Sequence, residues 1–236
     1  MKKVIKIFLL IILVLAIFFT FFIIFNGYSV YKKAVNTMNI EEKVSKVMEK
    51  EDYIKLNDLP KDYKNAVISV EDHRFYNHGA IDVIAIFRAI FSNIRSGEFL
   101  EGGSTITQQV AKNFYFISGD TNPVYRKIAE IFVANELEKK YEKDEILEFY
   151  VNTIYFGDGY YGIEEATNAY LNKSAKDMNL FEATMMAGIP NAPSVYAPTV
   201  NLDLTLSRQK KVISTMVENE YLTQMQADEL IKQQGT

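Results

Sequence analysis

Two carboxylates, two imidazoles and a guanidinium lie close together in the stretch Glu71-Asp72-His73-Arg74-Phe75-Tyr76-Asn77-His78-Gly79. A carboxylate placed here can act as a general base if it reaches a hydroxyl group and is partly desolvated. A solvated helix end with local salt bridges would contain the same residues. A spacing of five does not put His73 and His78 on one helical face, so the stretch does not favour a histidine-ligated metal site.

A second polar cluster follows a pair of glycines, in Glu101-Gly102-Gly103-Ser104-Thr105-Ile106-Thr107-Gln108-Gln109-Val110-Ala111-Lys112-Asn113. Backbone N–H groups at a helix start can bind an anion, and Lys112 could reach the same phosphate from the next turn. A flexible loop followed by a helix cap explains the pattern equally well. The cluster is not a P-loop, because no Gly-Lys-Ser/Thr stands at the turn.

A third cluster combines Arg126, Lys127 and Glu130. Arg126 and Glu130 are four residues apart, so on a helix they share a face and could form a simple ion pair. A functional interpretation requires that this cluster converge with the other two.

The elements that must position these clusters are predicted to be helices. Pro60 can open a helix running toward Val70, Ser104 can cap one through Ala111, and Asn122-Pro123 starts one through Glu138. Further helices are expected at 81–94, 144–152, 163–171, 180–187, 204–218 and 223–232, whereas strand patterns are scarce. Residues 187–198 are expected to form a Pro-interrupted loop. The sequence therefore predicts a mostly α-helical body.

The N-terminus carries a long apolar stretch at residues 7–25, in which Thr20 is the only polar residue. As a helix it would be about 28 Å long, which matches the hydrocarbon thickness of a bilayer. A signal peptide would have a shorter apolar region and a small-residue cleavage site, and a buried core helix would have a polar face. Lys2, Lys3 and Lys6 precede the stretch and favour a cytoplasmic N-terminus.

The predicted organisation is therefore a cytoplasmic segment at 1–6, a single transmembrane anchor at 7–25, a polar connector at 26–58 and an extracytoplasmic domain at 59–236. The chain has 236 residues, enough for one sizeable core. It has no cysteine, which excludes disulfide scaffolds, thiolate metal sites and a cysteine nucleophile. A formal net charge of −4 does not indicate nucleic-acid binding.

Taken in order, the motifs resemble those of the peptidoglycan glycosyltransferase family. They read Glu-Asp-x-x-Phe-x-x-His-Gly, Gly-Gly-Ser-Thr-Ile-Thr-Gln-Gln, Arg-Lys-x-x-Glu and Tyr-Phe-Gly-x-Gly-x-Tyr-Gly-Ile-Glu. The resemblance covers roughly residues 59–198. It implies a lysozyme-like helical fold and a membrane-bound enzyme that polymerises lipid II into β-1,4-linked glycan strands of the bacterial cell wall, with inversion and release of polyprenyl pyrophosphate.

The resemblance also implies residue roles. Glu71 looks like the general base, and Glu130 like a second important carboxylate near the pyrophosphate or a divalent metal, Mg or Mn, held there. Lys112, Arg126 and Lys127 would stabilise the leaving pyrophosphate. Further positions match residues that shape the donor site, namely Asp72, Phe75, His78, Gly102, Thr105, Gln109 and Asn113.

Residues 81–94 resemble the lipid-dipping region of the family, although an ordinary core helix fits an all-round apolar segment equally well. The expected partners are lipid II, the growing lipid-linked glycan and the membrane, together with other cell-wall synthesis proteins. Two alternatives have the same helical character: a lysozyme-like glycan-cleaving enzyme and a non-catalytic scaffold of wall synthesis.

A transpeptidase activity is not expected. Ser29 and Lys32 match Ser-x-x-Lys, as do Ser207 and Lys210, but no Lys-Thr-Gly follows either pair. The sequence thus predicts a monofunctional glycosyltransferase.

Overall fold

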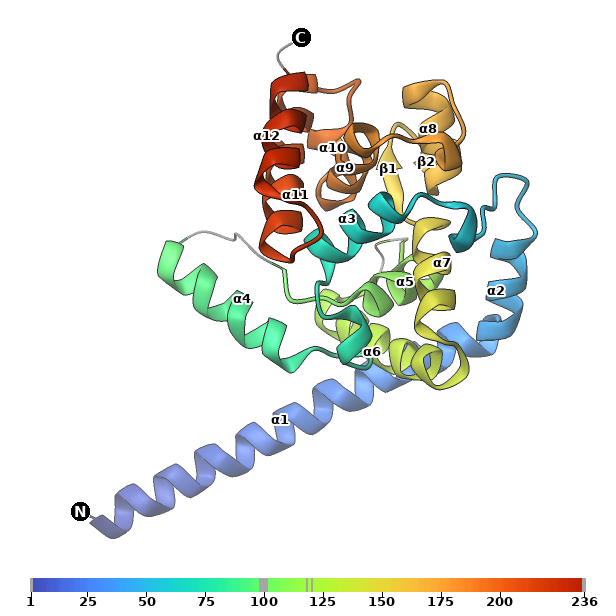
Figure 1. Ribbon diagram of the computed structural model, residues 1–236. Coiled ribbons are helices and arrows are strands. Elements are labelled where there is room, and N and C mark those ends of the chain that lie inside the picture. The colour runs from blue at the N-terminus through green and yellow to red at the C-terminus, as the bar shows by residue number, and fades with distance from the viewer. Residues whose placement is uncertain (1, 98–101, 118, 120, 235–236) are drawn as a thin grey trace.

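The computed structural model describes residues 2–97, 102–117, 119 and 121–234 (Figure 1). A long N-terminal helix, α1 (Lys2–Thr37), leads into a helical body with two lobes. The N-terminus lies at the free tip of α1 and the C-terminus at the far end of the body. The mostly α-helical prediction is confirmed.

The first part of α1 has the length and composition of a membrane span, with a mean hydropathy of 3.4 over its most apolar window and none of that window buried. Its large side chains, including Phe18 and Phe21, are exposed, so the protein itself does not cover them. The helix does not end with the apolar stretch but continues to Thr37.

The second part of α1 packs against α6 (Pro123–Lys140). Gly27 permits this close approach, since a Cβ added there would lie 2.4 Å from Cβ of Ile128. The rings of Tyr28 and Tyr31 contact Phe132, and the Tyr31 hydroxyl donates a hydrogen bond to Glu136. The apolar helix and α6 therefore form one packed unit.

Residues 26–58, expected as a connector, comprise the end of α1, helix α2 (Ile40–Met48) and a short 3-10 helix, η1 (Leu56–Asp58). Asn39 starts α2 with a capping box, its side chain accepting from the Glu42 N–H. The apolar side chains of α2 and η1 point into the core, among them Ile40, Val44 and Leu56. The polar residues that suggested a connector are those on the outer faces of these helices.

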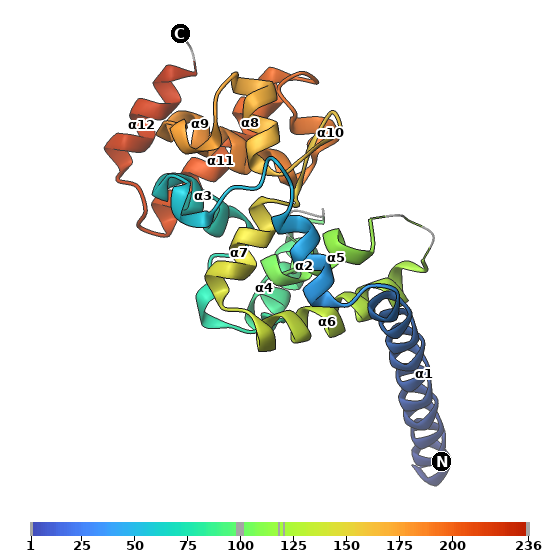
Figure 2. The same ribbon diagram turned by 90° about the vertical axis from the view of Figure 1, so that its right-hand side faces the viewer.

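The lower lobe in Figure 1 contains α5 (Ile106–Tyr115), α6 and α7 (Lys143–Val151) in mutual contact. The upper lobe is built around α3 (Lys61–Glu71), α9 (Leu180–Gly188) and α11 (Leu202–Glu218). Figure 2 shows α2 lying beside α5 on the lower lobe. The upper lobe also contains α8 (Ile163–Leu171), η3 (Ala175–Asp177), α10 (Pro193–Tyr196), α12 (Gln224–Gln233) and a short antiparallel hairpin of β1 (Tyr155–Gly157) and β2 (Tyr160–Tyr161).

The predicted helices are present, with local corrections. Thr105 rather than Ser104 caps α5, because its hydroxyl accepts from the Gln108 N–H. Residues 187–198 are not an open loop: they form the end of α9, η4 (Ile189–Asn191) and α10. Proline at the first turn of η4 and of α10 is compatible with helix, since its missing N–H would be unpaired there.

Helix α4 (Val83–Ser96) covers most of residues 81–94, for which the sequence allowed either a core helix or a lipid-contacting helix. Asp82 caps it, and Gly97 ends it in the left-handed region at φ 71°. Most of its large apolar side chains are over half exposed, including Phe87, Phe91 and Ile94, and among the described side chains of this helix only Ala89 is buried. The core interpretation is therefore wrong, and α4 presents an apolar face to its surroundings.

Candidate active site

Glu71 is the last residue of α3, where the chain leaves the helix into the interlobe region. Its Oε2 accepts a hydrogen bond of 2.8 Å from the Gln109 side-chain amide of α5. Its Oε1 is buried without a hydrogen-bond partner among the described residues, and so are the hydroxyls of Tyr63 and Tyr150. Burial raises the pKa of Glu71, and the Gln109 hydrogen bond and the Arg208 charge only partly oppose this. A carboxylate with these properties is suited to accept a proton.

Asp72 ties the end of α3 to the start of α5. Its two oxygens accept from His78 Nε2 at 2.7 Å and from the Ile106 N–H at 3.0 Å. Burial works against the charged form of His78, but the hydrogen bonds to Asp72 and to the Gly79 carbonyl, together with the Asp72 charge, outweigh it and raise the pKa of His78. The Thr105 hydroxyl donates to the Ala80 carbonyl at 3.0 Å and so holds the same junction. These three residues fix the position of Glu71 relative to α5.

Phe75 is fully buried beneath this junction. The Lys143 ammonium lies 4.4 Å from its ring centroid, and the ring also contacts Tyr76 and His78. Phe75 therefore supports the loop after α3 and does not border a cavity among the described pockets.

The third cluster lies on α6, facing α5. The buried Glu130 carboxylate pairs with Lys127 at 3.1 Å and with Arg126 at 3.5 Å. Lys127 also donates to the Ser104 hydroxyl at 2.7 Å. Lys112 on α5 is exposed and, within the described residues, no carboxylate pairs with it. Positive charge thus exceeds negative charge here, an arrangement suited to a multiply charged anion.

A divalent metal at Glu130 would meet an unfavourable set of neighbours. Both carboxylate oxygens face cationic side chains, and among the described residues Glu130 belongs to no group of three or more potential metal ligands. Mg²⁺ is usually held by one or two carboxylates plus substrate phosphates. The one cluster of potential ligands in the described part of the chain, Asp72, His78 and Asp82, is engaged in hydrogen bonds to the backbone and to Arg74. The protein residues alone therefore do not fit a resident metal.

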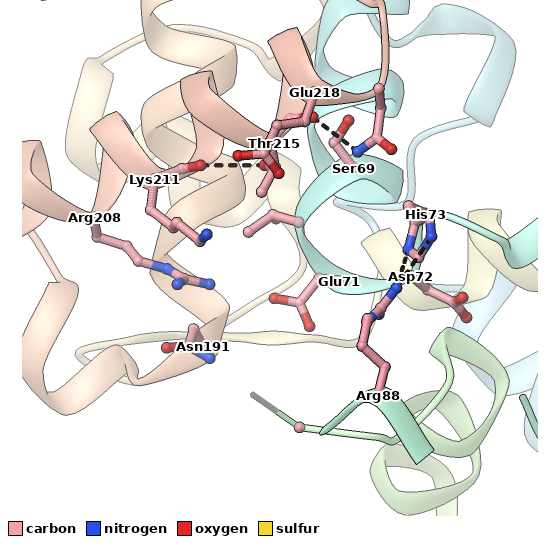
Figure 3. A pocket seen from close by; sticks show the side chains of 13 residues that line it. Ser69, Glu71, Asp72, His73, Arg88, Asn191, Arg208, Lys211, Thr215 and Glu218 are labelled. Carbon is pink, nitrogen blue, oxygen red and sulfur yellow. Dashed lines mark hydrogen bonds between the residues drawn. The ribbon is translucent and has the colours of Figure 1, made fainter. Parts of the chain in front are cut away.

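Two cavities meet at Glu71. The first lies between α3, α4 and α11 (Figure 3) and is lined by Ser69, Val70, Glu71, Asp72, His73, Arg88, Gly102, Asn191, Arg208, Lys211, Thr215, Glu218 and Asn219. The second lies between α5, α6 and the upper lobe and is lined by Glu71, Ser104, Gln108, Gln109, Lys112, Asn113, Lys127, Glu130, Ile154, Tyr155, Pro190, Asn191 and Pro193. Glu71 and Asn191 border both, so one carboxylate can face molecules bound on either side of it.

The structure thus brings Glu71, Gln109, Lys112, Asn113, Lys127 and Glu130 to one cavity, and Asp72 and Gly102 join Glu71 at the other. Arg126 reaches Glu130 but does not line either cavity. Phe75, His78 and Thr105 support the junction from behind.

Sequence reasoning missed the cations of α11. Arg208 and Lys211 extend from α11 toward Glu71 (Figure 3). The Arg208 side chain donates to the Gly188 carbonyl at 3.4 Å and lies over the Tyr196 ring. Their spacing of three puts them on one face of the helix, but α11 carries other exposed polar side chains, including Lys210, so the local sequence did not single them out.

A model of the transglycosylase family matches residues 36–217, which include all three clusters. The chain belongs to the transglycosylase family. It is 43% identical to penicillin-binding protein 1A of Neisseria lactamica over 186 residues, 79% of this chain and 23% of the relative. It is 40% identical to penicillin-binding protein 1F of Bacillus subtilis over 197 residues, 84% of this chain and 27% of the relative.

The chain therefore spans about a quarter of the length of these transglycosylase relatives. A solved structure, penicillin-binding protein 1A from Haemophilus influenzae, aligns with 26% identity over 54% of this chain and 16% of that one. Its TM-score is 0.37, too loose a match to establish the fold, which follows here from the helices themselves.

Proposed function

We propose that the protein is a peptidoglycan glycosyltransferase that polymerises lipid II into β-1,4-linked glycan strands. The observation that carries this proposal is the position of Glu71, a half-buried side chain with a buried Oε1 that lies between two cavities, one of which is also lined by Lys112 and Lys127. A base between two substrate sites, with cations on the side of a departing anion, is what sugar transfer from a lipid pyrophosphate requires.

In the proposed reaction the acceptor sugar lies in the first cavity, near Arg208 and Lys211, and the lipid-linked donor lies in the second. Glu71 takes the proton of the acceptor 4-hydroxyl, whose oxygen attacks the anomeric carbon of the donor. The bond from that carbon to the pyrophosphate oxygen breaks as the glycosidic bond forms. A single displacement inverts the configuration, as in inverting glycosidases.

The pyrophosphate leaves with the electron pair of the broken bond. Lys112 and Lys127 would stabilise this developing charge, and Arg126, behind them, would hold the Glu130 carboxylate in place. A divalent ion, if used, would arrive with the pyrophosphate, since Glu130 alone supplies too few ligands.

The membrane would hold the enzyme beside its substrate. The apolar part of α1 would span the bilayer with the N-terminus in the cytoplasm, and the exposed face of α4 would enter the outer leaflet with Phe87 and Phe91. The growing glycan and other wall-synthesis proteins would be met on the outer side. We also propose that these 236 residues have glycosyltransferase activity and no transpeptidase activity.

The two alternatives make different demands on the site. Cleavage of a neutral glycan needs no cluster of cations beside the second carboxylate, whereas Glu130 is flanked by Lys127 and Arg126. A scaffold needs no desolvated carboxylate at the meeting point of two cavities, which is where Glu71 lies.

One assay separates these functions. The full chain in detergent or vesicles is incubated with lipid II, and the products are resolved by length. Polymer from wild type and none from Glu71→Gln is the expected result. If the wild-type chain released short fragments from preformed glycan, the cleaving enzyme would be favoured. If it reacted with neither lipid II nor preformed glycan, the scaffold would be favoured.

A further inference from the structure

A third cavity adjoins the second one at Asn113, which lies one turn of α5 beyond the Gln109 that contacts Glu71. It lies between α2, the end of α5 and the β hairpin and is lined by Lys43, Lys46, Val47, Lys50, Asn113, Phe114, Ile117, Thr153 and Tyr161. Asn113 borders both cavities. The ring of Tyr155, in the wall of the second cavity, lies 4.7 Å from the ring of Tyr161 in the wall of the third. The two cavities therefore share a continuous wall.

The floor of this third cavity is strongly basic. Lys43 and Lys46 lie three residues apart on one side of α2, and Lys50 follows two residues after the helix ends; all three line the cavity and are called the α2 lysines below. The pKa of Lys43 is lowered, mainly by burial and secondly by the charge of the neighbouring Lys46. The Lys43 ammonium also lies 5.7 Å from the Tyr115 ring centroid. Within the described residues no carboxylate pairs with any of the three, so an anion bound here would relieve their mutual repulsion.

A hydrogen-bond donor is also available. The Nδ2 atom of Asn113 is buried and has no acceptor among the described residues. A buried donor without an acceptor is costly, so a bound ligand oxygen would remove that cost. On the far side of Lys50 the surface turns acidic, with Glu51, Asp52, Glu164 and Glu165. The basic surface formed by the three lysines therefore ends at Lys50.

We propose that this third cavity is the exit subsite for the growing glycan strand, in which the α2 lysines bind carboxylates on its peptide substituents. This assignment rests on the proposed function. The anomeric carbon of the donor must face Glu71, and the acceptor occupies the opposite side of that residue, so the rest of the donor strand must extend the other way. Tyr155 and Tyr161 offer aromatic surface to its sugar rings, and Asn113 offers a donor.

The test compares Lys46→Glu/Lys50→Glu with wild type, because both side chains are exposed and their replacement should leave the fold intact. The matched control is Lys176→Glu/Lys232→Glu, which reverses two exposed charges away from all three cavities. The full chain in vesicles is supplied with lipid II, and two quantities are measured: the rate of the first coupling, between two lipid II molecules, and the mean length of the strands.

We expect the first coupling to stay within about twofold of wild type, and the strands to shorten by about three- to tenfold, as the loss of two solvent-exposed ion pairs predicts. The control pair should leave both quantities unchanged. With lipid II from which the peptide has been removed, variant and wild type should give strands of equal length.

Strands of wild-type length from Lys46→Glu/Lys50→Glu on peptide-bearing lipid II would overturn the exit subsite while leaving the proposed function standing. A defect that persists without the peptide, and follows the anionic lipid content of the vesicles, would assign these lysines to the membrane and also overturn it. A wild-type chain that makes no polymer would remove the proposed function, and the exit subsite with it.

Discussion

The side-chain amide of Gln109 donates to one oxygen of Glu71 at 2.8 Å, while the other oxygen of Glu71 is buried and has no partner among the described residues. The two residues come from different helices, α3 and α5, that the Asp72 carboxylate joins. One half of the carboxylate is thus held in place, and the other half is left available. A general base needs both properties, because its orientation must be fixed without occupying the oxygen that receives the proton.

Replacing Glu71 by glutamine should abolish polymerisation while preserving the fold. The amide keeps the shape and can still bond to Gln109, but it cannot accept the proton of the acceptor hydroxyl. The loss in kcat should be at least about 10²–10⁴-fold. The measurement is strand formation from lipid II. Wild-type polymerisation by Glu71→Gln, with Glu51→Gln as an exposed-carboxylate control, would disprove the assignment of the base.

The pKa of Glu71 makes the pH dependence of activity and stability informative. Because burial raises this pKa, the activity should fall on acidification at a pH above the ordinary glutamate value of about 4.3.

The folded state prefers the protonated acid, so any stabilisation from Glu71 is present below that ordinary value and is lost as the pH rises through the raised pKa. Glu71→Gln should therefore have a higher Tm than wild type at pH 8 and an equal Tm at pH 4. Thermal melts of both proteins across this range measure the effect, and a lower Tm for the variant at pH 8 would contradict the burial argument.

The cations of the second cavity should act on the leaving group. Lys127→Ala should lower kcat by about 10²–10³-fold, the effect of losing one donor to a developing negative charge. Added pyrophosphate should inhibit the variant less than wild type. Lys139→Ala, an exposed lysine near the end of the same helix, is the control and should change neither value. Equal pyrophosphate inhibition of Lys127→Ala and wild type would show that Lys127 does not bind the leaving group.

The Asp72–His78 pair should stabilise the fold in a pH-dependent way. The folded pKa of His78 is raised, so the stabilisation is fully present below about pH 6.5 and is lost as the pH rises through the raised value. His78→Gln should therefore reduce the free energy of unfolding more at pH 6 than at pH 9, by about 1.5–3 kcal/mol at the lower pH.

The variant His73→Gln serves as a control in this experiment, because the expected pH dependence of its effect on stability is the opposite. Burial and the neighbouring Arg88 lower its pKa, so any stabilisation it contributes is present at high pH and is lost on acidification. The effect of His73→Gln should thus be larger at pH 9. Denaturant titrations at both pH values test the pair, and identical pH trends for the two variants would argue against the Asp72–His78 interaction.

Packing of α1 on α6 should matter for both stability and catalysis. In Gly27→Leu the new side chain would collide with Ile128, which should cost about 1–3 kcal/mol and displace the helix that carries Lys127 and Glu130. We expect a lower Tm and a lower kcat. Ser29→Leu, at an exposed position two residues further along α1, should behave like wild type. Full activity in Gly27→Leu would show that the α1 contact does not position the site.

Much of the helical framework could be predicted from the sequence, because its signals are local. Asn122-Pro123 starts α6 and Thr223 caps α12, as the capping preferences of these residue types predict. The exposed face of α4 could not be predicted, since an apolar segment looks the same whether protein or lipid covers it.

The site was only partly predictable for a similar reason. Glu71, Lys112 and Lys127 stand in recognisable motifs, but their convergence depends on how α3, α5 and α6 pack. Arg208 and Lys211 belong to a helix more than a hundred residues from Glu71 in the sequence, and Asn191 lies in a stretch expected to be a structural loop. Such long-range neighbours follow from tertiary packing, which no local pattern encodes.

The contact of Gly27 on α1 with α6 also sets how far α6 lies from the membrane-spanning stretch. Gly27 lies two residues beyond the apolar stretch at 7–25, which is about 3 Å along a helix axis, and it touches Tyr125 and Ile128 on either side of Arg126 and Lys127. With α1 spanning the bilayer, these cations would sit at the level of the lipid headgroups. A pyrophosphate joined to a membrane-embedded chain occupies that same layer. The substrate would then reach the site by lateral diffusion alone, with its lipid tail in the bilayer throughout.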